Sequence, residues 1–344
     1  MLRSRLDIHF PFRQQRLFCC GEPYAAQAGE FLLNHARSGI MLALKALHLP
    51  ENSGVGVMVY NCHTVFNAIE QAGMRPVFID VTPDLKIDTA DLQHKAQQIK
   101  ALVVTHLFGI RNDVAAIRRL CPDLPIVEDC AHACGISPIE GDLAVFSIGQ
   151  GKLPSIGDGG ILRVRNPQYL PAVNALYEQL QGYGRMQNVK LFCRMWLNAL
   201  MHTRLVYSLL TLPLKSRRGA VASRVDITPH RMSSGVSAIY NVERKYTDQR
   251  IEKRRTHAAT LAEYVAMQEG VERTLVGDNA FMLVVQCNNP TAFQRHLRVR
   301  GIDSATHFRH CITWATDFGY QPGSCPNAEQ LTKHLLMLPT YKSM

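Results

Sequence analysis

The alternation of short apolar runs with helix-like segments over the first 165 residues is what most limits the fold of this chain. Continuously apolar, β-like runs occupy residues 55–60, 76–81, 101–106, 126–129, 143–148 and 160–164. Apolar residues at helical spacing lie before and between these runs, at 38–49, 64–72 and near 113–120. Such a pattern indicates an α/β fold whose mostly parallel sheet is covered on both faces. Catalytic groups should then lie at the carboxyl ends of the strands.

After residue 166 the pattern changes to longer helices. We expect helices over 171–182, 190–215 and 233–265, with an exposed basic connection at 215–226. A β-like run at 280–286 and a helix at 291–300, ended by Gly301, follow. The second half therefore predicts a smaller α+β domain.

The composition excludes several classes of protein. With 344 residues, 47% of them apolar, the chain can bury a sizeable core and is not disordered. Its net charge of +10 suits anionic partners, but no zinc finger, recognition-helix motif or aromatic–basic repeat supports nucleic-acid binding. The ten cysteines include no CxxC pair, so we expect reduced thiols in a cytoplasmic protein and no metal site.

Neither a signal peptide nor a membrane span is predicted. The N-terminal segment is basic, lacks the apolar centre of a signal peptide and is interrupted by Pro11. The most apolar stretch, 191–214, carries Arg194, His202 and Arg204, whereas a spanning helix needs about 20 predominantly apolar residues.

Chemistry-bearing residues gather in the block from 126 to 160. Asp129 ends one predicted strand, Ser147 lies near the end of the next, and Lys152 follows in a loop with glycines around it. A pyridoxal cofactor needs an amine to bind its aldehyde, a carboxylate to keep its ring nitrogen protonated, and donors for its phosphate. Each residue alone has an ordinary explanation as a cap, a solvated charge or a turn, so the hypothesis depends on the ordered combination.

Several segments in this order resemble the DegT-type (DegT/DnrJ/StrS) pyridoxal-phosphate sugar aminotransferases. The resemblance covers most of the chain, from about residue 37 to 341. The matching segments are NAIEQAGMRPVFID (67–80), HLFG (106–109), IVEDCAHA (126–133), FSIGQGK (146–152), GDGG (157–160), RMS (231–233) and LP (338–339).

The resemblance implies the fold of aspartate aminotransferase, known as fold type I. This fold has a large domain with a mostly parallel seven-stranded sheet and a smaller α+β C-terminal domain. We place the large, cofactor-binding domain at 1–226, with a helical insertion at about 185–215. The small domain would be 227–344, without the family's usual final helix.

The resemblance also implies roles for residues around the cofactor ring. Lys152 would bind pyridoxal 5′-phosphate covalently and move the proton during transfer, and Asp129 would pair with the pyridinium nitrogen. His132 stands where the family usually has Gln beside the ring. The residue that stacks on the ring would be Cys62 or His63.

Phosphate and substrate contacts follow in the same way. Ser147 would donate to the phosphate, and Arg37 and Ser38 align with the phosphate-binding turn at a helix N-terminus. Contacts to the substrate are expected from His230, Arg231 and His307. Thr228, Pro229 and His230 stand where the family has an Asn that reaches the neighbouring subunit's cofactor.

The implied function is transfer of an amino group from an amino acid, glutamate or glutamine, to a nucleotide-linked keto sugar. Such a sugar would belong to polysaccharide, lipopolysaccharide or secondary-metabolite biosynthesis, and the enzyme would be a homodimer. The alternatives are a sugar dehydratase of the same fold and a non-catalytic or regulatory protein that keeps the fold. Two interpretations of the apolar–basic stretch 190–215 stay open. It could be a helix pair packed on the large domain, or it could bind weakly to an anionic membrane surface.

Overall fold

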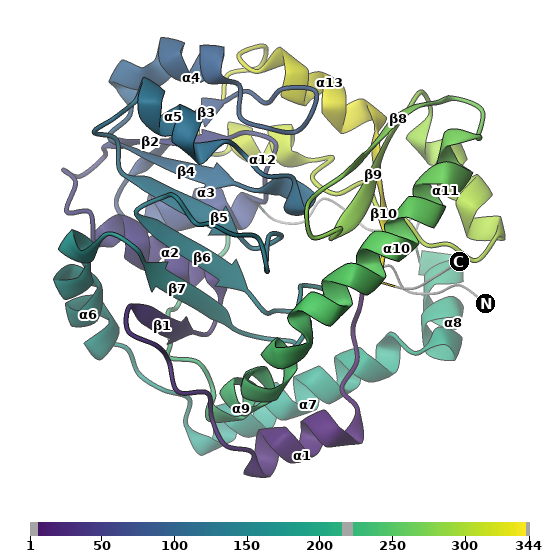
Figure 1. Ribbon diagram of the computed structural model, residues 1–344, viewed down its shortest axis with the longest axis horizontal. Coiled ribbons are helices and arrows are strands. Elements are labelled where there is room, and N and C mark those ends of the chain that lie inside the picture. Colours follow the sequence, from purple (N-terminus) through teal and green to yellow (C-terminus); the bar gives the residue numbers. More distant parts are fainter. Residues whose placement is uncertain (1–5, 215–222, 342–344) are drawn as a thin grey trace.

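The alternating strands and helices predicted for the first half of the chain form the larger of two sheets and the helices that cover it. A computed structural model describes residues 6–214 and 223–341. Among them, seven strands form one sheet in the order β1-β7-β6-β5-β4-β2-β3 (Figure 1). The strands are β1 (Glu30–Leu33), β2 (Gly54–Met58), β3 (Arg75–Ile79), β4 (Ala101–Thr105), β5 (Ile126–Cys130), β6 (Leu143–Ser147) and β7 (Gly160–Val164).

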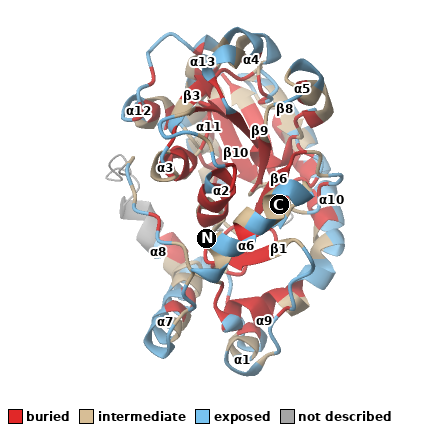
Figure 2. Cartoon of the chain, turned by 90° about the vertical axis from the view of Figure 1, so that its left-hand side faces the viewer, coloured by how far each residue is buried: buried red, intermediate tan, exposed pale blue. Residues whose placement is uncertain are grey.

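Strand direction in this sheet is mostly parallel, as predicted. The pairs β2–β3, β2–β4, β4–β5 and β5–β6 are parallel, whereas β7 runs antiparallel to both β6 and β1. Strands β2, β4, β5 and β6 are buried along their whole length (Figure 2). Their carboxyl ends therefore meet at one edge, where Thr105, Asp129 and Ser147 come together.

Helices cover this sheet, and several begin where the sequence offers a cap. Helix α2 packs across β5, β6 and β7 and against α3 and α6. Asp88 and Asp113 accept hydrogen bonds from the first backbone N–H groups of α4 and α5, which fixes where these helices start. The helices are α2 (Ala36–Lys45), α3 (His63–Gln71), α4 (Thr89–Lys95), α5 (Val114–Leu120) and α6 (Leu170–Glu178).

A second, antiparallel sheet lies in the C-terminal part of the chain. Its strands β8 (Val271–Val276), β9 (Met282–Cys287) and β10 (Leu335–Pro339) have the order β10-β9-β8. Helices α10 (Thr247–Ala266) and α11 (Pro290–Val299) pack against it, and α12 (Cys311–Thr316) and α13 (Pro326–His334) complete this part. A smaller α+β unit is therefore present, and its boundary at 226/227 stays a prediction.

Some elements differ from the sequence prediction. The helix expected at 233–265 is divided into α9 (Ser234–Glu243) and α10 by a 3-10 turn at Arg244–Tyr246. The 190–215 stretch is a helix pair, α7 (Arg185–Met201) and α8 (Arg204–Leu214). Helix α1 (Phe12–Cys20) and strand β1 have no counterpart in the prediction, because both are too short for a clear period.

Two further expectations concern exposed and membrane-spanning segments. Residues 215–222 of the basic connection expected at 215–226 lie outside the described residues. Within the described ranges, none of the helices has the length and apolar character needed to cross a membrane.

Beneath the sheet edge, a buried pair of side chains joins β5 to the loops around it. The Nε2 of His106 donates to Glu128 Oε2 at 2.8 Å, because His106 Nδ1 already accepts the backbone N–H of Asn112 at 3.1 Å. Glu128 also accepts the backbone N–H groups of Glu140 and Gly141. Burial raises the pKa of Glu128, but these hydrogen bonds outweigh it and leave the pKa below its ordinary value.

We expect Glu128→Ala to lower the free energy of unfolding by about 3 kcal/mol, because it leaves two buried donors and one part-buried donor without an acceptor. Urea denaturation with an unchanged slope would measure this loss. The matched control is Glu51→Ala at an exposed position, which should change stability by no more than about 0.5 kcal/mol. Equal stability of the two variants would contradict this role of Glu128.

Candidate active site

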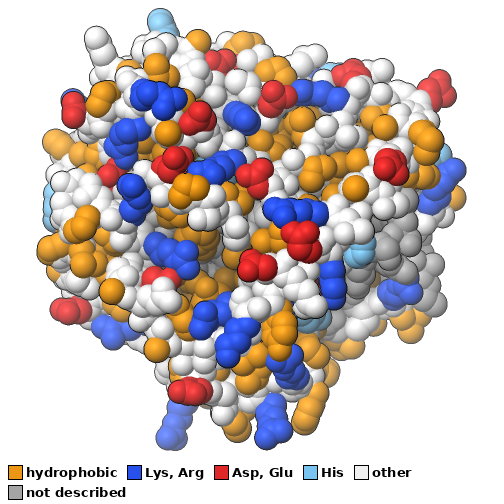
Figure 3. All heavy atoms as spheres, in the orientation of Figure 1, with side chains coloured by type: hydrophobic (Ala, Val, Ile, Leu, Met, Phe, Trp, Pro, Cys, Tyr) orange, Lys and Arg blue, Asp and Glu red, His pale blue; other side chains and the backbone are white. Residues whose placement is uncertain are grey.

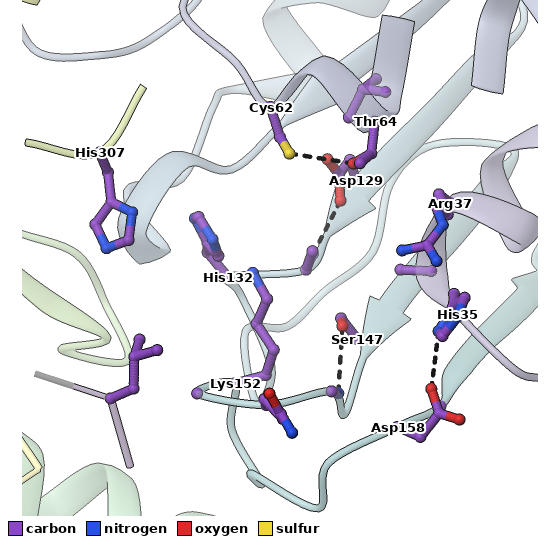
Figure 4. A pocket seen from close by; sticks show the side chains of 18 of the residues that line it. His35, Arg37, Cys62, Thr64, Asp129, His132, Ser147, Lys152, Asp158 and His307 are labelled. Atoms are coloured by element: carbon purple, nitrogen blue, oxygen red, sulfur yellow. Dashed lines mark hydrogen bonds and ion pairs between the residues drawn. The ribbon is translucent and has the colours of Figure 1, made fainter. Parts of the chain in front are cut away.

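A pocket of about 610 Å³ lies at the carboxyl ends of β4, β5 and β6. It is lined on one side by the loop between β6 and β7, and on another by residues at the start of β9 and by residues after α11. Of the residues predicted from the sequence, those that line it are Arg37, Cys62, Asp129, His132, Ser147, Lys152 and His307 (Figure 4). The pocket thus combines an amine, a buried carboxylate and a guanidinium.

Lys152 enters the pocket from the turn that joins β6 to β7. The turn is held locally, because Lys152 N donates to Gly149 O at 3.2 Å and Gly151 N donates to Ser155 Oγ at 2.9 Å. Gly151 has a φ of +71°, a conformation that side-chain-bearing residues rarely adopt. Burial lowers the pKa of Lys152 although Cys62 and Asp129 raise it, so more of the amine is in the neutral, nucleophilic form.

Asp129 lies at the end of β5 with its carboxylate toward the pocket (Figure 4). Only 3% of the residue is exposed. Thr105 Oγ1 donates to Oδ2 at 3.2 Å, and the backbone N–H of Ala131 donates to Oδ1 at 3.0 Å. Burial raises the pKa of Asp129 although Ala131, Lys152 and Thr105 lower it. This carboxylate would therefore gain from a further cationic donor in the pocket.

His132 lines the pocket and stacks on two aromatic rings. Its ring stacks on Phe281 at 4.6 Å and on Phe108 at 5.4 Å, and its Nδ1 accepts the backbone N–H of Phe108 at 3.3 Å. Burial, together with the charge of Lys152, lowers the pKa of His132 well below its ordinary value. The imidazole is consequently neutral, and its proton lies on Nε2.

The opposite wall carries the positive charge of the site. Arg37 extends from α2 toward the pocket, and its buried Nε has no hydrogen-bond partner among the described residues (Figure 4). Beside it, buried Asp158 binds His35 Nδ1 at 2.8 Å and Arg194 Nη2 at 3.2 Å. Asp158 therefore binds His35 and Arg194. The Nε of Arg37 stays available to an anion in the pocket.

Four of the predicted site residues lie outside the pocket. Ser38 Oγ is buried and donates to Asn34 Oδ1 at 2.8 Å, and the His63 ring packs against Trp314 at 4.8 Å. His230 stacks on Tyr183 at 5.5 Å, and Arg231 lies over the Tyr177 ring at 5.1 Å. Of the two residues considered for ring stacking, Cys62 is the one at the pocket.

Sequence reasoning missed several residues that line the pocket. Asp158 lies within the GDGG segment, where only the glycines were considered. Thr105 lies near the end of the strand predicted at 101–106, and that strand pairs with the one that carries Asp129. These two had a usable signal in their positions. His35, Asn61, Arg194 and Phe281 had none, because they reach the pocket only through tertiary packing.

The sequence model of the DegT/DnrJ/EryC1/StrS aminotransferase family matches residues 31–344. The chain belongs to this family. A dTDP-3-amino-3,4,6-trideoxy-alpha-D-glucose transaminase of Micromonospora megalomicea subsp. nigra is 25% identical over 331 residues, which is 91% of this chain and 80% of that protein. GDP-perosamine synthase of Vibrio cholerae is 28% identical over 156 residues, which is 40% of this chain and 42% of that protein.

Solved structures support the same fold. An aminotransferase from Streptoalloteichus hindustanus has a TM-score of 0.73 at 20% identity, over 98% of this chain and 93% of that one. A sugar aminotransferase from Micromonospora echinospora has a TM-score of 0.71 at 18% identity, over 98% and 94% of the two chains. The fold is that of the type I pyridoxal-phosphate aminotransferases, as predicted.

The family and fold imply pyridoxal 5′-phosphate, and the residues present fit it. The buried Asp129 carboxylate suits a protonated ring nitrogen, and the unpartnered Nε of Arg37 suits a phosphate. Lys152 supplies the amine that binds an aldehyde. Ser147, which accepts the Gly149 N–H at 3.4 Å, lies between Lys152 and Arg37 and could donate its hydroxyl to the phosphate (Figure 4).

We expect Arg37→Gln to weaken binding of pyridoxal 5′-phosphate by about 10- to 100-fold, because a charge-assisted hydrogen bond contributes about 1.5–3 kcal/mol. Titrating the cofactor into the apoprotein and following its visible absorbance measures the dissociation constant. Arg119→Gln on the exposed end of α5 removes the same charge far from the pocket and should leave the constant unchanged. A wild-type constant for Arg37→Gln would exclude the phosphate contact.

Proposed function

We propose that this protein is a pyridoxal-phosphate-dependent aminotransferase that moves an amino group from glutamate or glutamine to the keto group of a nucleotide-linked sugar. The observation that carries the proposal is the meeting of Lys152 and Asp129 in one pocket, with Arg37 on the opposite wall. The names of two relatives, a dTDP-amino-sugar transaminase and GDP-perosamine synthase, support the class of substrate.

The residues of the pocket divide the work of such a reaction. The bound cofactor supplies an aldehyde that accepts the amino group and a ring that withdraws electrons from the reacting carbon. Lys152 Nζ, whose pKa is lowered by burial, would take the proton from the α-carbon of the donor and deliver it to the C4′ carbon of the cofactor. Asp129 would hold the proton on the ring nitrogen of the bound cofactor and so keep the ring able to withdraw electrons. His132, being neutral, can donate Nε2–H to a ring oxygen without adding charge.

The substrate would enter from the side of the pocket that carries His307. Tyr60 donates its hydroxyl to the His307 carbonyl oxygen at 3.0 Å and so fixes this residue's backbone at the pocket. We therefore propose His307 as a substrate contact. His230 and Arg231 lie outside the pocket of the single chain, so a role for them would depend on a second subunit. The proposed sugar substrate would belong to polysaccharide, lipopolysaccharide or secondary-metabolite biosynthesis.

The alternatives make different demands on the same pocket. Sugar dehydratases of this fold replace the lysine that this chain keeps as Lys152. A regulatory protein could bind the cofactor but would not turn over a donor. Incubating the holoenzyme with glutamate or glutamine and a panel of keto-sugar nucleotides, and measuring both the keto acid and the amino sugar, distinguishes the three. A bound cofactor without either product would overturn the proposal.

Lys152→Ala should abolish transamination while leaving the fold intact, because this side chain contributes little to the core. Borohydride treatment of wild-type holoenzyme should fix the cofactor to the protein, and mass spectrometry should locate it at Lys152. Lys190→Ala, an exposed lysine on α7, is the matched control and should keep full activity. Turnover by Lys152→Ala at the wild-type rate would refute its role.

We also propose a homodimer, because enzymes of this fold form their sites at a two-fold interface. A single long helix at 233–265 would offer a face for such packing, but this segment is divided into α9 and α10. Helix α9 packs on α1 within the chain, so its apolar face is already covered. Sedimentation at micromolar concentration should give twice the mass of the chain. An active enzyme that stays monomeric would exclude a site shared between subunits.

A further inference from the structure

Helix α7 turns apolar side chains outward as well as inward. Leu191 and Met195 are buried against the body of the protein. On the other side, Met186, Val189, Trp196 and Leu200 are 68%, 57%, 48% and 41% exposed. Their spacing of three, seven and four residues places these side chains along one face of the helix. We call these four residues the α7 stripe.

Helix α8 continues the same exposed surface. Leu205 and Leu209 are 56% and 63% exposed and lie four residues apart, so they share one face, whereas Tyr207 is buried. Arg204 precedes them and is exposed. Both helices lie at the edge of the molecule, outside the two sheets (Figure 2). Hydrophobic and basic side chains, with acidic ones among them, lie along the lower edge in Figure 3, where Figure 1 places α1 next to α7.

The charge around this surface is of one sign. The 47 residues from 179 to 225 contain eight Lys or Arg and no Asp or Glu, so they carry eight of the chain's ten net positive charges. Of these cations, Arg185, Lys190 and Arg204 are exposed on α7 and α8. Arg194 is paired with Asp158 and belongs to the pocket, and Arg224 is paired with Glu70. Lys215, Arg217 and Arg218 lie outside the described residues. The rest of the chain is nearly neutral, so the basic character is local to this segment.

The α7 stripe lies among the exposed cations Arg185, Lys190 and Arg204, and this combination favours some binding partners over others. A second copy that docked this segment on the same segment of its partner would bring cations against cations, without an acid in the segment to pair with them. An anionic lipid surface offers negative headgroups to the cations and an apolar layer to the stripe, and Trp196 suits the boundary between the two. We propose that the outward face of α7 and α8 binds peripherally to anionic lipid bilayers.

The position of α7 gives such binding a geometric effect. Arg194 and Asn198, on the inward side of the same helix, line the pocket. A bilayer in contact with the α7 stripe would therefore lie one helix diameter from the pocket wall. The proposal concerns this surface alone and does not depend on the reaction assigned to the pocket.

Flotation of the full-length holoenzyme with vesicles tests the proposal. Vesicles of phosphatidylcholine and phosphatidylglycerol in equal parts should carry the protein upward at low salt, and less of it at high salt, because salt screens exposed charges. Vesicles of phosphatidylcholine alone should carry much less. No flotation with the anionic vesicles at low salt would overturn the proposal.

Substitutions assign the binding to this surface. Each cation near an anionic surface strengthens binding about five-fold, so Arg185→Gln with Lys190→Gln should weaken it about 25-fold. Leu200→Ser with Leu205→Ser should also weaken it. The matched control combines Arg119→Gln on α5 with Val299→Ser on α11, where Val299 is 85% exposed. Cofactor absorbance and circular dichroism check that each variant is folded.

Two results would assign the surface differently. If the control weakens flotation as much as the Arg185 and Lys190 variant, binding reflects overall charge and the proposal fails. If the leucine variant keeps flotation but halves the mass measured by sedimentation, the surface joins two copies of this chain, and the proposal is again wrong. The proposal is supported if both the Arg185/Lys190 variant and the Leu200/Leu205 variant float less, the mass is unchanged, and the control variant floats as the wild-type protein does.

Discussion

The site depends on one carboxylate that the fold takes out of water. Asp129 is buried at the end of a central parallel strand, where an isolated charge would be expensive. Its neighbours offset this cost only in part, through the hydroxyl of Thr105, one backbone N–H and the nearby amine of Lys152. The buried Asp129 carboxylate thus lacks a full set of partners, and a cationic ring N–H in the pocket would supply the missing one.

The adjacent β5 residues Glu128 and Asp129 lie on opposite faces of the sheet. Glu128 points away from Asp129, because successive side chains of a strand alternate, and it ties His106 and the backbone at Glu140 and Gly141 into one network. Cys130, which lies within 4.8 Å of that network, stays protonated because burial raises the pKa of its thiol. The network is therefore a structural clamp built from hydrogen bonds, and it holds still the strand end from which Asp129 reaches the pocket.

The sequence allowed the parallel sheet and the strand-end part of the site to be predicted, and physical reasons explain the rest. Asp129, Ser147 and Lys152 could be placed together because the carboxyl ends of neighbouring parallel strands meet. Ser38 and His63 could not be placed reliably, since a shift of one residue on a helix turns a side chain by about 100° away from the pocket. Arg194 was assigned to a membrane-like stretch, and only packing reveals that it reaches Asp158. The division between α9 and α10 was likewise hidden, because helical spacing of apolar residues continues through the 3-10 turn.

The antiparallel course of β7 makes the loop that carries Lys152 a hairpin whose ends are paired directly, Ser147 with Gly160. The turn contacts that position the amine lie within this hairpin, which Asp158 and Gly159 also anchor to the chain around His35. The carboxylate opposite it is positioned by the long-range pairing of β4, β5 and β6. The two halves of the reactive centre therefore depend on largely different contacts. A change in the length of the hairpin could re-aim the amine toward a different substrate atom while leaving the sheet, and the acid it buries, undisturbed.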